Sequence, residues 1–273
     1  MLTLVPTPIG NIEDISARAL KALEKADIFL CEDTRVTKKL LGLVKQKYNI
    51  APAPARFISL HSHNEKKFLQ KIDPSFFDKN VVYVSDAGMP GISDPGAILV
   101  DYCIKNGIEY DVLPGPSAFV TAYAASGFNS SRFLFFGFLP HKGHDRKRAF
   151  ENVMNSGFDT IIYESPHRLL KLFEEIVAYD CDREVFAVKE LTKKFQKYYR
   201  GKVVQIFEKL KNENIKGEWV VIIKASEKKE TALDINDILS LDIPKKQAAK
   251  LLSKITGKSI KECYNHLLRN ETS

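Results

Sequence analysis

Residues 81–96, VVYVSDAGMPGISDPG, join a short run of strand-forming residues directly to a loop rich in glycine and proline. Residues 2–11 (LTLVPTPIGN) and 110–117 (YDVLPGPS) repeat this arrangement. Open α/β sheets bind ligands where buried strands end in such loops, because glycine lets a ligand approach the backbone closely. One such loop is an ordinary turn between a strand and a helix. Three of them near the start of the chain predict a nucleotide-like or cofactor site.

The three loops differ from the familiar phosphate-binding loops. No segment reads G-x-x-x-x-G-K-[ST], and none reads G-x-G-x-x-G after a strand. The sequence therefore argues against a nucleoside triphosphatase and against a standard dinucleotide-binding fold.

The composition indicates a globular intracellular protein. A length of 273 residues suits two domains, and no run approaches the roughly 20 apolar residues that span a membrane. No signal peptide is apparent, and the four cysteines lack C-x-x-C spacing, so we expect buried thiols in a reducing cytoplasm. The net charge of +7 fits a polyanionic partner.

Strands and helices are expected to alternate in the first part of the chain. We predict strands at 2–5, 27–32, 57–60, 81–85 and 110–113, and helices near 16–25, 64–72 and 97–105. This βαβα order predicts a mostly parallel sheet with helices on both faces. An alanine-rich helix should follow, beginning near Ser117 and ending at Gly127.

A second α/β lobe is expected to begin near residue 132. We predict strands at 133–139, 160–164, 184–190 and 217–223, and helices at 145–155, 167–178 and 203–211. The strand at 133–139 is apolar enough to suggest a position away from an exposed edge. These patterns predict lobes at 1–116 and 117–228, with the three loops meeting in a cofactor cleft between them.

A small helical module is expected beyond the polar linker at residues 226–232. Pro244 precedes one helical pattern, and Ser259 with Glu262 forms a capping-box pattern ahead of another. Two short helices over 232–273 predict a helix-turn-helix-like module. A helical hairpin packed on the second lobe fits the same pattern equally well.

Positive charge is concentrated at residues 141–148, 189–202 and 243–273. Lysine and arginine neutralise phosphates, and the second cluster also contains aromatic residues that can stack on bases. A solvated surface is the ordinary explanation of any one cluster, but three together favour nucleic acid. The candidate RNA-binding residues are Arg35, Lys142, Arg146, Arg148, Arg168, Lys193, Lys194, Lys197, Lys245 and Lys246.

Polar side chains gather where four of the predicted strands end, at residues 32–35, 85–86, 163–168 and 189–190. This edge carries the functional groups of α/β sheets, although helix caps and salt bridges between the lobes would explain Asp33 and Arg168 equally well. Ser117 lacks the G-x-S-x-G context of a hydrolase nucleophile. His61 and His63 are weak evidence for a metal, so we expect none.

Taken together, six segments resemble one family. They are residues 5–11, 32–35, 85–96, 113–118, 137–140 and 163–168. In order and in content they are similar to the RsmI family of bacterial small-subunit ribosomal RNA methyltransferases, within the tetrapyrrole-methylase-like superfamily. The similarity runs from about residue 2 to 225, and the helical tail resembles that family's C-terminal module.

The resemblance implies two α/β lobes of the tetrapyrrole-methylase type, with S-adenosyl-L-methionine in the cleft between them, and a homodimer. It also implies methyl transfer to the ribose 2′-hydroxyl of a cytidine in the decoding region of 16S rRNA. The cofactor contacts that it implies are Pro8, Gly10, Met89, Ile92, Ser117, Ala118, Tyr163, Glu218 and Trp219. The tetrapyrrole-type relatives usually carry Gly-Asp-Pro where this chain has Gly88-Met89-Pro90, so only a backbone contact is expected at Met89.

A ribose hydroxyl is a weak nucleophile, so this chemistry calls for a general base or for a cation that lowers the hydroxyl pKa. Asp86, Glu164 and Glu190 are the candidate bases, and Lys189 is the candidate cation. A tetrapyrrole methyltransferase is the first alternative, against which the basic clusters and the helical module count. A non-enzymatic RNA-binding relative is the second, and the intact set of three loops disfavours it.

Overall fold

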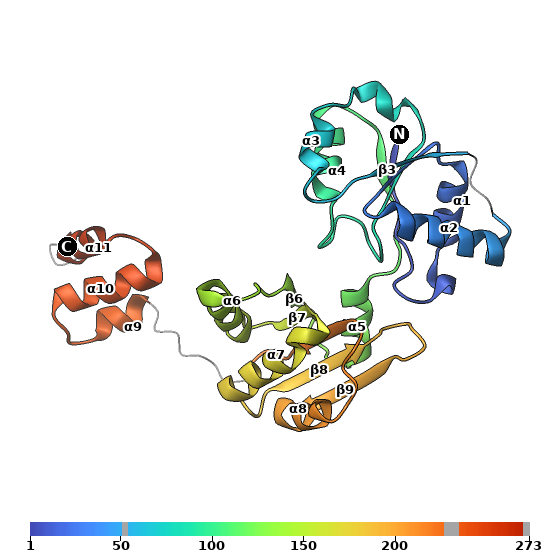
Figure 1. Cartoon of the computed structure of the whole chain (residues 1–273). Helices are drawn as coiled ribbons and strands as arrows, with labels where there is room; N and C mark the ends of the chain where they lie inside the picture. Colours follow the sequence, from blue (N-terminus) through green and yellow to red (C-terminus); the bar gives the residue numbers. More distant parts are fainter. Residues whose placement is uncertain (51–53, 227–234, 270–273) are drawn as a thin grey trace. The chain divides into compact units, whose positions relative to one another are not determined.

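The computed structural model describes residues 1–50, 54–226 and 235–269, which divide into two compact units, Met1–Ser226 and Glu227–Ser273. The strands of the first unit are β1 (Leu2–Leu4), β2 (Ile28–Cys31), β3 (Arg56–Ser59), β4 (Val81–Val84), β5 (Tyr110–Val112), β6 (Phe133–Phe138), β7 (Asp159–Glu164), β8 (Glu184–Lys189), β9 (Lys197–Lys202) and β10 (Trp219–Ile223). Its helices are α1 (Ala17–Lys25), α2 (Thr34–Tyr48), α3 (Glu65–Leu69), α4 (Ala97–Lys105), α5 (Ala118–Ser126), α6 (Gly143–Met154), α7 (Pro166–Tyr179) and α8 (Val203–Lys211), with 3-10 turns at Ile12–Asp14 and Pro74–Asp78. Figure 1 shows their arrangement.

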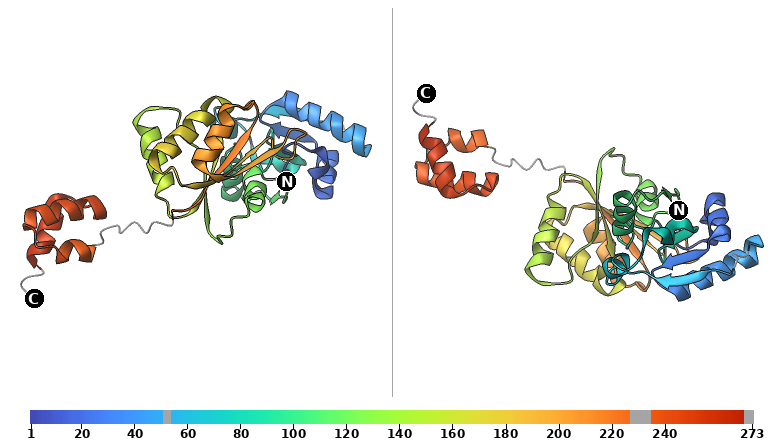
Figure 2. Two further views of the ribbon diagram at one scale, coloured as in Figure 1. Left: turned by 90° about the horizontal axis from the view of Figure 1, so that it is seen from below. Right: turned by 90° about the horizontal axis from the view of Figure 1, so that it is seen from above.

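The first five strands form a parallel sheet in the order β3-β2-β4-β1-β5. Successive side chains of a strand point to opposite faces, so Phe29 packs with α1 and α2 while Leu30 packs with α3 and α4. Both faces are therefore covered, as the βαβα order predicted, and the loops after the strands all emerge at one edge because the strands are parallel. Figure 2 shows the ribbon from two further sides.

The other five strands form a mixed sheet in the order β6-β7-β10-β8-β9. Only β6 and β7 run parallel; β10 is antiparallel to both of its neighbours, and β9 is antiparallel to β8. Helices α6, α7 and α8 cover one face, and α5 covers the other. Two α/β lobes are thus present, and the predicted fold class is confirmed.

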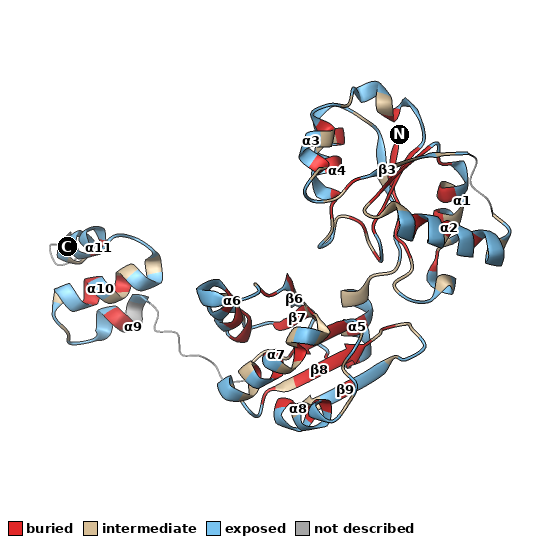
Figure 3. Cartoon of the chain, viewed as in Figure 1, coloured by how far each residue is buried: buried red, intermediate tan, exposed pale blue. Residues whose placement is uncertain are grey.

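Three elements were absent from the sequence prediction: α2, β9 and α9 (Ile235–Ser240). In β9 only Tyr199 is buried, because this edge strand turns charged residues toward solvent, and the prediction interpreted it solely as a basic cluster. Figure 3 shows the contrast between buried β8 and exposed β9. Because α9 is only six residues long, its sequence carries too little periodicity to be recognised.

The expectation that the strand at 133–139 avoids an exposed edge was wrong. Strand β6 lies at the edge of the mixed sheet and has a bulge between Phe135 and Gly137. It leaves Phe133 and Phe138 exposed, and Phe138 lies in the pocket described below. An apolar edge strand is tolerated here because part of its surface lines a pocket and is covered by neighbouring residues.

The second unit is a bundle of three short helices: α9, α10 (Lys245–Thr256) and α11 (Ile260–Arg269). They share a small core that includes Ala249, Leu252 and Cys263. The predicted capping box is confirmed, since Ser259 Oγ accepts a hydrogen bond from the Glu262 N–H at 3.3 Å and Glu262 Oε2 accepts one from the Ser259 N–H at 2.9 Å. The sequence predicted two helices in this module, and its described residues form three.

Candidate functional site

The loop between β4 and α4 has a backbone that requires glycine. Gly96 adopts a φ of +133°, and a Cβ there would lie 3.0 Å from Tyr83 Cε1 and 3.1 Å from the Gly91 nitrogen. The loop folds back on itself, since the Gly91 N–H donates to the Pro95 carbonyl at 3.1 Å. The buried Glu65 carboxylate accepts from the Gly96 and Leu99 N–H groups and so fixes the start of α4.

The three glycine- and proline-rich loops come together at the carboxyl edge of the parallel sheet. Thr7 and Gly88 exchange two backbone hydrogen bonds of 3.0 Å, which join the first loop to the second. The third loop packs on the first so tightly that a Cβ at Gly115 would lie 2.6 Å from Pro6 Cβ. The predicted meeting of the loops is therefore confirmed.

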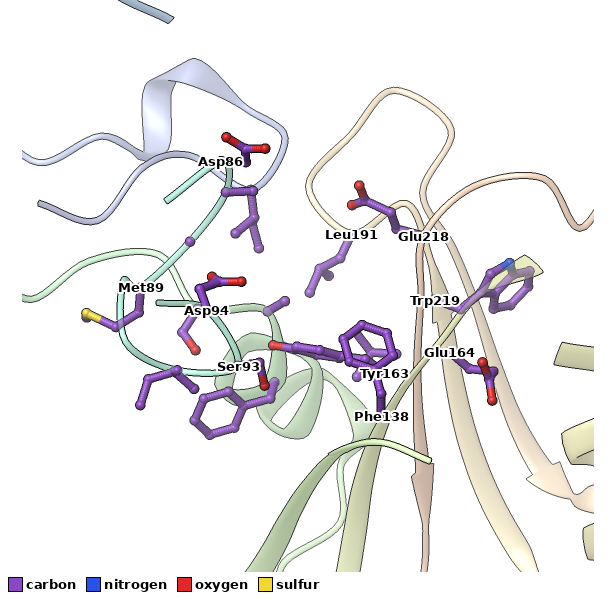
Figure 4. Close-up of a pocket in the computed structure, with 18 of the residues that line it drawn as sticks. Asp86, Met89, Ser93, Asp94, Phe138, Tyr163, Glu164, Leu191, Glu218 and Trp219 are labelled. Atoms are coloured by element: carbon purple, nitrogen blue, oxygen red, sulfur yellow. The ribbon is translucent and has the colours of Figure 1, made fainter. Parts of the chain in front are cut away.

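A pocket of about 480 Å³ lies between these loops and the second lobe (Figure 4). This volume falls within the range of small-molecule sites. Its lining comes from the loops after β1, β2 and β4, from the starts of α5 and α7, and from β6, β7, β8 and β10 with the residues next to them. The lining residues are Ile9, Glu32, Asp86, Ala87, Gly88, Met89, Ile92, Ser93, Asp94, Ser117, Ala118, Phe119, Phe138, Tyr163, Glu164, Ser165, Pro166, Val188, Leu191, Gly217, Glu218, Trp219 and Val220.

Carboxylates give one wall of the pocket a negative character. Burial raises the pKa of Asp94 to about 6, and the nearby Glu32 and Asp86 add to this shift, while a hydrogen bond with Ser85 opposes it. Burial also raises the pKa values of Glu32 and Asp86 above their ordinary values. Opposite them, burial raises the pKa of the Tyr163 hydroxyl to about 12, so this group stays protonated at neutral pH.

Seven of the nine expected cofactor contacts line the pocket: Met89, Ile92, Ser117, Ala118, Tyr163, Glu218 and Trp219. Pro8 and Gly10 do not, although Ile9 between them does. Gly10 instead packs against Leu191, Thr192 and Lys193 of the second lobe. The Trp219 indole donates to the Ile215 carbonyl at 2.8 Å and points away from the cavity in Figure 4.

The four expected catalytic residues are divided between the pocket and its surroundings. Asp86 and Glu164 line the pocket, whereas Lys189 and Glu190 lie outside the lining. The Lys189 ammonium donates to the Asn214 carbonyl. The Glu190 carboxylate accepts from the Glu218 N–H at 2.8 Å and pairs with Lys193 at 3.2 Å.

Arg146 was wrongly placed on an RNA-binding surface, because its side chain is only 4% exposed and is held in a buried ion-pair network. Its guanidinium forms two hydrogen bonds to Glu175, at 3.1 and 2.7 Å, and lies 3.8 Å from Glu164. Arg168 also turns inward, with a 2.7 Å contact to Glu164 and a 3.0 Å hydrogen bond to the Leu139 carbonyl.

The other expected RNA-binding residues lie at or near the surface, several in ion pairs. Arg35 pairs with Asp33, Arg148 with Asp145, Lys197 with Glu213, and Lys193 with Glu190 and Glu218. Lys142, Lys194 and Lys246 are exposed, and Lys245 is partly exposed. Lys194 lies over the ring of Phe195, whose side chain is 69% exposed.

Sequence reasoning missed Asp94, Phe138 and Leu191 as pocket residues. Asp94 lies within residues 81–96, the segment that predicted the second loop, so its place in a loop after a strand was the available signal. Phe138 and Leu191 come from the second lobe, and no local pattern distinguishes them from core residues.

Within the described ranges, no group of three or more His, Cys, Asp or Glu side chains is arranged to hold a metal ion. In the same residues, no helix is both long and apolar enough to cross a membrane.

A two-lobed α/β unit, with Gly/Pro loops facing an aromatic wall across one pocket, defines a ligand-binding fold of a recognisable class. Residues 1–206 match the family of Tetrapyrrole (Corrin/Porphyrin) Methylases. Among solved structures, a uroporphyrin-III C-methyltransferase from Thermus thermophilus, complexed with S-adenosylhomocysteine, has a TM-score of 0.56 at 15% identity and covers 81% of this chain and 96% of that one. This likeness establishes the fold.

Two curated relatives are much more similar in sequence. The ribosomal RNA small subunit methyltransferase I of Campylobacter fetus is 47% identical, with 98% of this chain and 100% of the relative covered. The protein of that name from Helicobacter pylori is 45% identical, with 99% of both chains covered. The chain belongs to the ribosomal RNA small subunit methyltransferase I family, within the tetrapyrrole methylases, and the resemblance seen in its sequence is confirmed.

Proposed function

We propose that this protein transfers the methyl group of S-adenosyl-L-methionine to the ribose 2′-hydroxyl of a cytidine in the 16S rRNA of the small ribosomal subunit, in the cytoplasm. The observation that carries the proposal is the pocket itself, since its Gly/Pro loops belong to a chain that is 47% identical over its length to a ribosomal RNA small subunit methyltransferase I.

The residues of the pocket fit this methyl donor. The carboxylates of Glu32 and Asp86 suit the positive charges of a sulfonium and an ammonium group, and the aromatic and aliphatic wall suits a flat purine ring. Met89 and Ile92 on the second loop, and Ser117 and Ala118 at the start of α5, are the residues that we expect to hold the donor. When bound, the donor supplies an electrophilic methyl group.

The pocket also positions the reactants and excludes water. The double hydrogen bond between Thr7 and Gly88 holds two of the loops in one geometry, so the pocket is largely formed before any ligand binds. Phe138 and Leu191 provide apolar cover over the polar wall. Reduced hydration of the attacking oxygen makes it a better nucleophile.

The test is mass spectrometry of nucleosides from undermethylated 30S particles that have been incubated with the protein and labelled donor. We expect label in 2′-O-methylcytidine. Label in a methylated base would contradict the ribose chemistry. Label transferred only to a tetrapyrrole would favour the small-molecule alternative, and no transfer to either would favour the non-enzymatic one.

The connection between β8 and β9 is the part of the first unit that best suits RNA. Leu191 lines the pocket, and four residues farther on Phe195 projects into solvent beside Lys194. Tyr198 is also 52% exposed. Exposed aromatic rings next to cations stack on unpaired bases, so this connection is suited to hold RNA beside the reacting hydroxyl.

Helix α10 carries a second basic surface. Lys246, Lys250 and Lys254 are spaced four residues apart and are all exposed, so they lie in one row along the helix. The core of the bundle is formed by the opposite face, with Ala249 and Leu252. This row is suited to track a phosphate backbone, and we propose that it helps to dock the 30S particle.

Removal of residues 232–273 should weaken binding to 30S particles and flatten the dependence of that affinity on salt. Each phosphate contact that is lost should lower the slope of log K against log salt by roughly 0.7 to 0.9. Donor affinity should stay within about threefold, because the donor pocket lies wholly in the first unit. The measurements are 30S binding at several salt concentrations and calorimetry with the donor.

A triple change of Lys246, Lys250 and Lys254 to glutamine is the matched control for this truncation, because it keeps the bundle intact. It should reproduce most of the change in slope. If the truncation unfolds the first unit or destroys donor binding, the bundle is a structural part of the second lobe and the docking role fails.

We also infer a homodimer, as family resemblance implies. Strand β5 is an edge of the parallel sheet and exposes Tyr110 and Val112. Light scattering of the purified protein tests the oligomeric state directly.

A further inference from the structure

Asp94 lines the pocket near the end of the loop between β4 and α4. The loop that carries it is tightly fixed, because Pro95 and Gly96 follow directly and both take part in the hydrogen bonds that define the loop. In Figure 4 the Asp94 carboxylate and the Tyr163 hydroxyl point toward the same part of the cavity. The charge of Asp94 also contributes to the raised pKa of Tyr163, which is consistent with this proximity.

The three carboxylates that the sequence suggested as bases are already engaged. The Asp86 carboxylate accepts from the Asp33 N–H at 3.1 Å and so ties the loop to the start of α2. Glu164 is completely buried, pairs with Arg168 and points away from the cavity in Figure 4. Glu190 lies outside the lining and pairs with Lys193.

No lysine or arginine of the described residues forms an ion pair with Asp94. The groups that face it are acidic or neutral: Glu32 from the end of β2, Asp86 and Ser85 from the loop after β4, Tyr83 from β4 and Tyr163 from β7. Burial and the two neighbouring carboxylates therefore make Asp94 a stronger base than an ordinary aspartate. A carboxyl group whose pKa lies near the working pH is suited to general base catalysis.

We propose that Asp94 is the general base that takes the proton of the attacking ribose hydroxyl, an inference that rests on the proposed function. The ribose oxygen forms a bond to the methyl carbon as the bond from that carbon to the sulfonium sulfur breaks. The electron pair of the broken bond stays on sulfur. The hydroxyl proton passes to the Asp94 carboxylate and from there to solvent, so no further reactant is needed.

Asp94→Asn should lower kcat for methylation of 30S particles by about 100-fold or more, because the isosteric amide cannot accept the proton. In the wild-type protein kcat should fall as the pH drops through about 6, since protonation of Asp94 removes the base. The variant should lose this acidic limb of the profile. Donor affinity, measured by calorimetry, should remain within about fivefold of the wild-type value.

Asp101→Asn is the matched control, because it makes the same chemical change on an exposed position of α4 that pairs with Lys105. It should leave kcat and the pH profile unchanged. Asp94→Glu keeps a carboxylate on a longer side chain, so it should retain an acidic limb at a shifted pH together with partial activity. This second variant keeps the test informative if Asp94→Asn folds poorly.

The outcomes separate this inference from the proposed function. If the wild-type protein places no label in 2′-O-methylcytidine, the proposed function fails. If the wild-type protein is active and Asp94→Asn retains kcat within about threefold with its acidic limb intact, Asp94 is not the base. Loss of donor binding in Asp94→Asn would instead assign the carboxylate to holding the donor and would overturn the catalytic role.

Discussion

Ser117→Trp should lower the affinity for S-adenosyl-L-methionine by roughly 100-fold or more, a loss of about 2.7 kcal/mol of binding free energy. Ser117 precedes α5, lines the pocket and makes no side-chain hydrogen bond to the start of that helix. Its φ of −147° is open to any residue, so the indole should enter the cavity without disturbing the backbone. Calorimetry with the donor measures the loss.

The melting temperature of Ser117→Trp should change by no more than about 2 °C, since the added ring fills a cavity and displaces no core side chain. Ala125→Trp is the matched control, because it adds the same ring to an exposed position of α5. It should leave donor affinity unchanged. Normal donor binding by Ser117→Trp would mean that the donor occupies another part of the protein.

Arg146→Met should lower the free energy of unfolding by about 3 kcal/mol, because it removes a buried cation that pairs with Glu175 and leaves Glu164 with Arg168 alone. The Arg146 guanidinium is almost fully enclosed, and it holds Glu175 through two hydrogen bonds while facing the wholly buried Glu164. The methionine side chain fills similar space, so the effect should arise mainly from the lost charge. Urea denaturation measures it.

Arg148→Met is the matched control, because Arg148 lies two residues farther along α6 and its side chain is exposed. It should change stability by no more than about 0.5 kcal/mol. The opposite result would be a small change in the free energy of unfolding for Arg146→Met, together with a salt dependence of 30S binding that is lower by one phosphate contact. That result would place Arg146 on the RNA-binding surface.

The sequence by itself determined the class of fold and where the site lies along the chain. Strand-forming residues that run directly into Gly/Pro loops identify the carboxyl edge of a sheet, because a buried strand and a tight turn both leave local signatures. The capping box at Ser259 and the end of α5 at Gly127 are equally local, and both were predicted correctly. The six segments from residue 5 to 168 sufficed to recognise the family.

Only the tertiary structure decided which charged residues face the site and which are structural. Arg146 and Arg148 are both cations in one basic segment, yet the first is buried in an ion-pair network and the second is exposed. Glu164 ends strand β7 and Asp94 lies in the loop after β4, but the first pairs with an arginine and the second faces the open pocket. The reason is physical. The neighbours that pair with a charged side chain, or leave it unpaired, come from distant parts of the sequence, so the residues next to it in the chain do not predict them.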